Sequence, residues 1–216
     1  MSNFLNKLTI KNKVKRPTTP TYRPAFLSEP YVNTYIVKGN FKTVVALPRG
    51  VDENEWLAAN TCDFFNHLNL FYGAIADYCT TRECPSMSAG QGTEFTWTDA
   101  SKKSLKLAAP TYVDYVMSWV QNLIDSEDVF PTKTDHGFGQ DFILTVRAIF
   151  KQLHRIFAHL YYSHYEQILG LHSEGHLNSL YAHFIVFSRE FDLLDKKELS
   201  VMADLVSEME AANRLR

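Results

Sequence analysis

The sequence has few of the features that mark a secreted or membrane protein. Only three of its 216 residues are cysteines, Cys62, Cys79 and Cys84, and an odd, small number does not suit a disulfide scaffold. No apolar run approaches the roughly 18 residues that indicate a membrane-spanning helix. Residues 1–15 lack an apolar stretch followed by a small-residue cleavage site, as a secretory signal would have. These absences predict a protein of the cytoplasm or nucleus.

Positive charge is scarce outside the N-terminus. Residues 1–25 carry six bases and no acid, which leaves 16 bases against 24 acids in the remainder, a net charge of −8. A body with this balance is a poor ligand for phosphate backbones, so the sequence argues against a nucleic-acid-binding protein. The N-terminal bases are scattered rather than densely clustered, which indicates a solvated arm.

The distribution of proline and of apolar residues divides the sequence into two regions. Four prolines lie among scattered bases and threonines within residues 1–30, which we interpret as a flexible basic arm. The remaining residues, 31–216, are long enough to bury one sizeable core and contain no internal repeat. We expect a single helical domain there.

Helical periodicity dominates the domain. Asp52 and Glu55 have capping-box spacing ahead of an apolar pattern that runs to about Tyr78. Further helices are expected from Pro110, over 141–169, after Gly175 and after Asp195, with two short strands at 93–98 and 104–107. The predicted fold class is all-α, a helical bundle with four core helices, extra short helices, one small β-hairpin and a loop tied by zinc.

Two pairs of side chains have the chemistry of zinc ligands. Cys79 and Cys84 are five residues apart after the first helix, and His159 and His164 are five apart late in the long helix. Two thiolates and two imidazoles would complete a tetrahedron and leave no place for a reactive water. On one ideal helix, however, the two histidines lie ~140° apart. The residues alone therefore leave open a core His164, an exposed His159 and buried cysteines without a metal, as we expect for Cys62.

Several segments resemble the Mob family, in family order and with the right separations. The segment 47–58, Leu-Pro-Arg-Gly-Val-Asp-Glu-Asn-Glu-Trp-Leu-Ala, is similar to the family's Leu-Pro-x-Gly-x-Asp-x-Asn-Glu-Trp run. The segment 79–90 is similar to its Cys-x4-Cys-Pro-x-Met motif. Further matching segments are 129–133, 155–164, 176–180 and 183–195. The resemblance covers about residues 31–207.

This resemblance implies a non-catalytic coactivator of NDR/LATS-type protein kinases, with one structural zinc on Cys79, Cys84, His159 and His164. Details of 37–43 and 178–184 look more like the branch that partners NDR kinases in cell polarity and morphogenesis than the branch serving cell-cycle signalling. The positions implied to bind the basic N-terminal region of the kinase are Asp52, Glu53, Glu55, Trp56 and Asp63. Acids beside an aromatic ring suit Arg and Lys partners, although Asp52 and Glu55 could simply cap the helix and Trp56 could be core.

A second implied site binds phosphothreonine peptides of an upstream kinase or scaffold. Lys151 and Arg155 match it, one helical turn apart, and we expect both to point away from the apolar stripe. Gln152 replaces a base and so weakens a phosphate clamp. The alternative is two solvated bases with no ligand. A phosphopeptide adaptor therefore stays open as an alternative function. A zinc hydrolase is a lesser one, because Glu83 and Glu166 are the only acids adjacent to proposed ligands.

Overall fold

The computed structural model describes residues 23–37, 39–90, 92–99, 101–133 and 136–216. Its longer helices are α2 (Glu53–Ile75), α3 (Ala109–Ile124), α4 (Phe142–Ser163) and α6 (Glu174–Glu190). The shorter elements are the 3-10 turns η1 (Ala25–Leu27), η2 (Tyr31–Asn33) and η3 (Ser200–Met202), the helices α1 (Phe41–Val45), α5 (Tyr165–Gly170), α7 (Lys196–Leu199) and α8 (Ala203–Ala211), and the strands β1 (Trp97–Thr98) and β2 (Ser104–Leu105).

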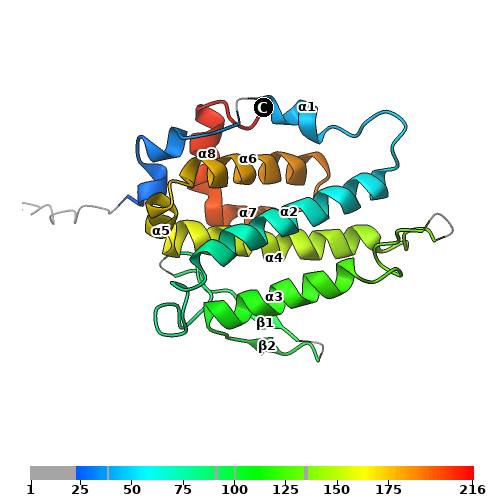
Figure 1. Cartoon of the computed structure of the whole chain (residues 1–216), viewed down its shortest axis with the longest axis horizontal. Helices are drawn as coiled ribbons and strands as arrows, with labels where there is room; N and C mark the ends of the chain where they lie inside the picture. Colours follow the sequence, from blue (N-terminus) through cyan, green and yellow to red (C-terminus); the bar gives the residue numbers. More distant parts are fainter. Residues whose placement is uncertain (1–22, 38, 91, 100, 134–135) are drawn as a thin grey trace, which may run out of the picture.

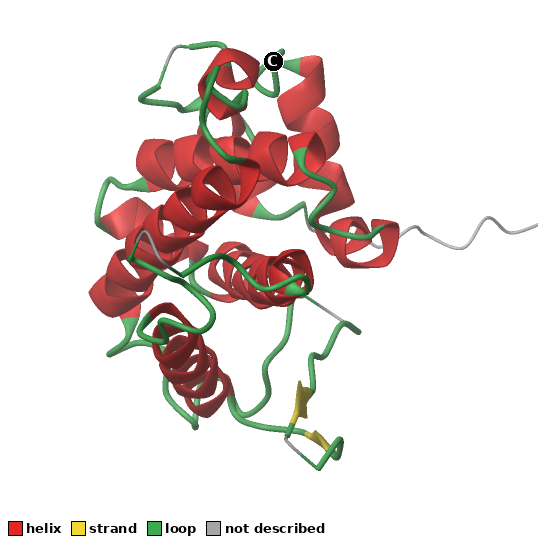
Figure 2. Ribbon diagram, turned by 90° about the vertical axis from the view of Figure 1, so that its right-hand side faces the viewer, coloured by secondary structure: helices red, strands yellow, loops and turns green. Residues whose placement is uncertain are grey.

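Helix α4 lies at the centre of the bundle. It packs against α2 and α3, and α2 also contacts α6, so the four long helices share one core (Figure 1). The predicted apolar stripe of α4 is fully buried. Its members are Val146, Ile149, Phe150, Leu153, Ile156, Phe157 and Leu160. The predicted all-α bundle with four core helices is therefore confirmed (Figure 2). No helix in the described ranges has the length and apolar character of a membrane span.

Helix α2 begins where the capping pattern predicts. The Asp52 side chain accepts hydrogen bonds from the backbone N–H groups of Asn54 and Glu55, at 2.9 and 3.2 Å, and so satisfies two free donors of the first turn. The helix ends at Ile75, three residues before the expected end at Tyr78. Its buried side therefore stops just ahead of the loop that carries Cys79.

The hairpin is present but shorter than expected. Trp97 pairs with Leu105 and Thr98 with Ser104, in antiparallel register. The outer residues of the predicted strands do not extend this ladder. The Leu107 carbonyl instead accepts a hydrogen bond from the backbone N–H of Met87 at 3.0 Å, which ties the hairpin to the loop after α2.

The end of the predicted flexible arm packs onto the domain. Residues 1–22 of that arm lie outside the described residues. Residues 25–33 form η1 and η2, and Phe26, Leu27 and Val32 are buried there. Burial of these side chains against α5, α6 and α8 attaches residues 25–30, the end of the predicted arm, to the folded body.

Candidate functional site

The two predicted ligand pairs meet at one point. All four side chains, Cys79, Cys84, His159 and His164, are buried, and their ligand atoms lie within 4.8 Å of one another. The Cys79 sulfur is 3.5 Å from Nε2 of His159, and the Cys84 sulfur is 3.5 Å from Nε2 of His164. Zn–S bonds of about 2.3 Å and Zn–N bonds of about 2.0–2.1 Å give a tetrahedral S···N edge of about 3.6 Å. The cluster can therefore hold a metal ion, and its donor set fits zinc.

A break in the predicted long helix brings the two histidines together. The helix expected to run to residue 169 ends at Ser163, and α5 starts at Tyr165. His164, between them, has φ −130° and ψ 16°, outside the helical range. The break removes the ~140° separation that a continuous helix would impose. The imidazole rings of His159 and His164 consequently lie 5.0 Å apart, centre to centre.

The loop after α2 supplies both thiols and an anchor for one imidazole. The Cys84 backbone N–H donates to the Thr80 carbonyl at 2.8 Å, closing a turn between the cysteines. Further along the loop, the Ser88 carbonyl lies 2.8 Å from Nδ1 of His159. Gly90 then takes φ +68° close to α4, where a Cβ atom would lie 2.8 Å from the Tyr162 ring. The loop therefore fits tightly against the histidine-bearing helix.

Burial determines the protonation states of the four ligands before metal binds. It lowers the pKa of His164 to about 4 and also lowers that of His159, so both imidazoles are neutral at pH 7. It raises the pKa of Cys79 to about 12 and raises that of Cys84. A metal ion must therefore displace the thiol protons, and its affinity rises with pH.

Four protein ligands define what this centre can do chemically. They fill a tetrahedron, so a metal there has no open position at which water could become a nucleophile. The neighbouring acids Glu83 and Glu166 are both exposed. The centre instead joins the end of α2 to the end of α4, two points 80 residues apart in the sequence.

The predicted acidic residues lie at the start of α2 and along it, and their carboxylates are not used in ion pairs within the described residues. Asp52, Glu53, Glu55 and Asp63 are all exposed, and no ion pair in the described part of the chain uses any of them. Trp56 is half-buried, and its indole N–H donates to the Val45 carbonyl at 3.0 Å. The ring thus braces the start of α2 while part of it stays accessible.

A groove of about 350 Å³ adjoins Asp63. Its wall is formed by α1, α2, α6 and the segment before α1, with the exposed apolar side chains of Ile36 and Val37 at its edge. Ser179 on α6 holds this edge in place by accepting hydrogen bonds from the two backbone N–H groups, at 3.1 and 3.3 Å. The groove is lined by Ile36, Val37, Phe41, Asn60, Asp63, Phe64, His67, Phe71, His176, Ser179, Leu180 and His183.

One side chain in the wall of this groove, His183, has a ring nitrogen without a hydrogen-bond partner in the described structure. Its ring stacks on Phe41 and contacts Phe64, with centroids 5.5 and 4.8 Å apart. Its Nε2 atom is buried and has no hydrogen-bond partner among the described residues. Sequence reasoning missed this groove because its lining comes from four separate segments. The only local signal was the adjacent apolar pair Ile36 and Val37 outside any periodic pattern.

The two bases of the predicted phosphate-binding pair already share an internal carboxylate. Lys151 and Arg155 both lie 3.0 Å from the buried carboxylate of Glu198. Arg155 also donates to the Tyr112 hydroxyl at 3.0 Å, and its side chain is only 14% exposed, so neighbouring elements cover it. The Gln152 side-chain carbonyl accepts a hydrogen bond from Tyr112 at 2.6 Å. These contacts form an internal network rather than a free cationic surface.

The acid in this network stays ionised. Burial favours the protonated form of Glu198, but hydrogen bonds from Arg155 and Lys151 outweigh it, and the pKa of Glu198 is lowered. A phosphate at this position would have to compete with a carboxylate held by two bases.

Comparison with known proteins identifies relatives over nearly the whole chain. The Mob1/phocein family model matches residues 33–202. "Maintenance of ploidy protein mob2" of Schizosaccharomyces pombe is 44% identical over 211 residues, covering 97% of this chain and 86% of that protein.

Two further relatives carry names that describe kinase activators. "MOB kinase activator-like 1 homolog A" of Dictyostelium discoideum is 46% identical over 181 residues, 83% of this chain and 85% of that protein. "CBK1 kinase activator protein MOB2" of Candida albicans is 43% identical over 201 residues, 93% of this chain and 64% of that protein.

Proposed function

This chain belongs to the Mob1/phocein family, and we propose that it is a non-catalytic coactivator of an NDR/LATS-type serine/threonine kinase. It binds the basic N-terminal region of that kinase and promotes activation, in cell polarity and morphogenesis or in cell-cycle signalling. The names of its relatives, among them activators of the kinase CBK1, support this function. With its cysteines reduced, the protein works in the cytoplasm or nucleus.

The observation that carries the proposal is a row of exposed acids along α2 without ion pairs in the described structure, the last of which, Asp63, lines a mostly apolar groove. Asp52, Glu53 and Glu55 begin α2, and Asp63 lines the groove two turns later. A basic amphipathic helix fits this surface, because its apolar side chains can enter the groove while its Arg and Lys residues meet the carboxylates.

The metal centre gives this surface its rigidity. We assign one structural zinc ion to Cys79, Cys84, His159 and His164, because thiolate and imidazole ligands in a complete tetrahedron suit zinc. When bound, zinc supplies cross-linking rather than reactivity. The four side chains fix the end of α2 relative to α4, and so hold the acidic face in one orientation toward the core.

Activation by this route needs no chemistry from the adaptor. The adaptor shifts the kinase toward its active arrangement if it binds that arrangement more tightly than the inactive one. We limit the proposal to this docking function. The filled ligand set does not favour a hydrolase, and the Glu198 contacts of Lys151 and Arg155 do not favour a phosphopeptide site.

A binding and activity assay with purified components tests the proposal. The full chain should bind the N-terminal region of an NDR-type kinase, with an affinity that falls as salt screens the acidic face. It should also raise phosphotransfer by the full-length kinase toward a peptide substrate. If this region does not bind at low salt, or if kinase activity is unchanged by saturating adaptor, the proposed function is wrong.

A further inference from the structure

Two of the four metal ligands have an evident partner outside the ligand set. His159 Nδ1 lies 2.8 Å from the Ser88 carbonyl, which fixes the ring with Nε2 toward the metal position. The Tyr72 hydroxyl hydrogen-bonds to Cys79. Histidine ligands of zinc almost always donate their other ring N–H to such a partner, which sets tautomer and orientation. His164 therefore needs an acceptor of its own.

The geometry of His164 determines which nitrogen needs that acceptor. Its Nε2 lies 3.5 Å from the Cys84 sulfur and faces the common centre of the four ligands. Metal binding through Nε2 requires a proton on Nδ1. The acceptor must therefore lie on the opposite side of the ring, toward the start of α5.

Gln167 lies one turn beyond His164 and carries an unused acceptor. Its side-chain carbonyl oxygen is buried and has no hydrogen-bond partner within the described residues. At the third position of a helix, a glutamine can reach back to the backbone N–H of the residue that precedes the helix. That N–H, on His164, already donates to the Leu160 carbonyl at 3.1 Å. The Gln167 side chain instead interacts with the His164 imidazole, where it partly offsets the lowering of that group's pKa by burial, and the two residues line a common cavity.

We propose that Gln167 is a positioning residue of the metal centre, whose side-chain carbonyl accepts the Nδ1–H of His164 and orients this imidazole for zinc. With this contact formed, the buried carbonyl oxygen of Gln167 would have its hydrogen-bond partner. The proposal goes beyond the kinase function and depends only on zinc at the four-ligand cluster.

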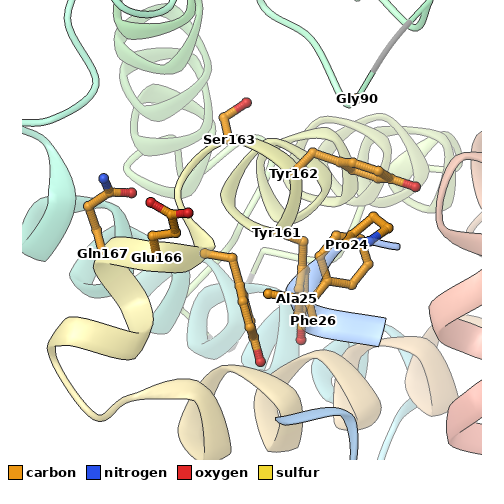
Figure 3. Close-up of a pocket in the computed structure, with 10 residues that line it drawn as sticks. Pro24, Ala25, Phe26, Gly90, Tyr161, Tyr162, Ser163, Glu166 and Gln167 are labelled. Atoms are coloured by element: carbon orange, nitrogen blue, oxygen red, sulfur yellow. The ribbon is translucent and has the colours of Figure 1, made fainter. Parts of the chain in front are cut away.

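Gln167 also lines the cavities on both sides of the α4–α5 junction. It lines a cavity of about 790 Å³ beside Cys84 and His164, and a second cavity of about 790 Å³ beside Phe26 and Tyr162. Figure 3 shows Gln167 with Glu166 and Ser163 around the α4–α5 junction, at the edge of the second cavity. Its side chain therefore takes up space beside His164 that water would otherwise occupy. Loss of the acceptor and loss of the bulk should both speed zinc release.

The rate of zinc release from the full chain to an excess of a chromophoric chelator tests this assignment. Gln167→Met keeps the bulk but removes the acceptor, and we expect release about 10–100-fold faster than in the wild type. Gln167→Glu retains an acceptor oxygen and should release zinc no faster than the wild type. Gln121→Met, on the exposed face of α3, makes the same change far from the centre and should leave the rate unchanged.

The substitutions separate an orienting acceptor from a merely space-filling residue. Equal release rates in Gln167→Met and the wild type would overturn the assignment, as would equally fast release in Gln167→Glu and Gln167→Met. Complete loss of zinc in Gln167→Met with retention in Gln167→Glu supports it. The absorption bands of cobalt substituted for zinc should shift in Gln167→Met and not in Gln121→Met. If the wild type binds no zinc, the metal proposal itself fails, which is a different result from unchanged release.

Discussion

Replacing Cys79 with serine should reduce bound zinc from about one ion per chain to a small fraction of that and lower the melting temperature by ~10–20 °C. The Cys79 sulfur is almost fully buried, 3.5 Å from the His159 imidazole. Serine preserves the shape but is a poor zinc ligand. We expect a loss of roughly 5 kcal/mol in the free energy of unfolding, because metal binding is coupled directly to folding. Zinc content by mass spectrometry and thermal unfolding by circular dichroism measure both effects.

Cys62→Ser is the matched control for this prediction. Cys62 lies half-buried on α2, away from the four-ligand cluster. The same change there should leave zinc content at one per chain and cost at most about 1 kcal/mol. If Cys79→Ser keeps its zinc, or if both variants lose the same stability, the ligand assignment is contradicted.

Reversing the charge at Glu55 and Asp63 together should weaken binding of the kinase N-terminal region about 100-fold. Each reversal replaces an attraction to a basic side chain with a repulsion, and about 1.4 kcal/mol per site corresponds to a factor of ten in affinity. Both side chains are exposed and free of ion pairs within the described structure, so Glu55→Lys/Asp63→Lys should stay folded. Isothermal titration at fixed ionic strength measures the effect.

The control for that variant changes the net charge by the same amount elsewhere. Glu190→Lys/Asp204→Lys alters exposed acids on α6 and α8 that make no ion pair in the described part of the chain. Its affinity should stay within about threefold of the wild type, since long-range attraction alone is largely screened. A similar loss of affinity in both variants would indicate attraction to the overall negative charge. Unchanged affinity in both variants would refute docking at α2.

Short-range sequence patterns predicted those parts of the fold that depend on interactions between residues close in the sequence. The apolar stripe from Val146 to Leu160 recurs at the helical period, and α4 buries every residue of it. Asp52 caps α2 through its own side chain, so its role depends on residues at most three positions away. Such features require no knowledge of the rest of the chain.

Features that depend on distant contacts could not be predicted in the same way. No proline or glycine marks the break at His164, and only the meeting of α4 with the cysteine loop shows why the helix ends there. Glu198 has capping-box spacing from Asp195, but its carboxylate reaches Lys151 and Arg155, more than 40 residues away. The burial of Phe26 likewise depends on side chains of α4 and α5.

Part of the candidate site could be predicted from the sequence, and part depends on contacts between distant segments. Ligand chemistry and family resemblance identified the four metal-binding side chains, and the geometry brings them within 4.8 Å. The acids of α2 were predicted as residues, but the groove beside Asp63 was not, because α1, α2 and α6 build it together. The proposed docking surface is therefore larger than the sequence indicated.

The most direct test of this account is amide hydrogen exchange of the zinc-loaded full chain, alone and with the kinase N-terminal region bound. Docking at the acidic face predicts slower exchange in residues 36–47, in the exposed part of α2 and at the start of α6, where the groove is formed. The hairpin at β1 and β2 should exchange at an unchanged rate. Protection confined to the hairpin or to α7, with none along α2, would contradict the claim that a metal-braced acidic face receives the kinase.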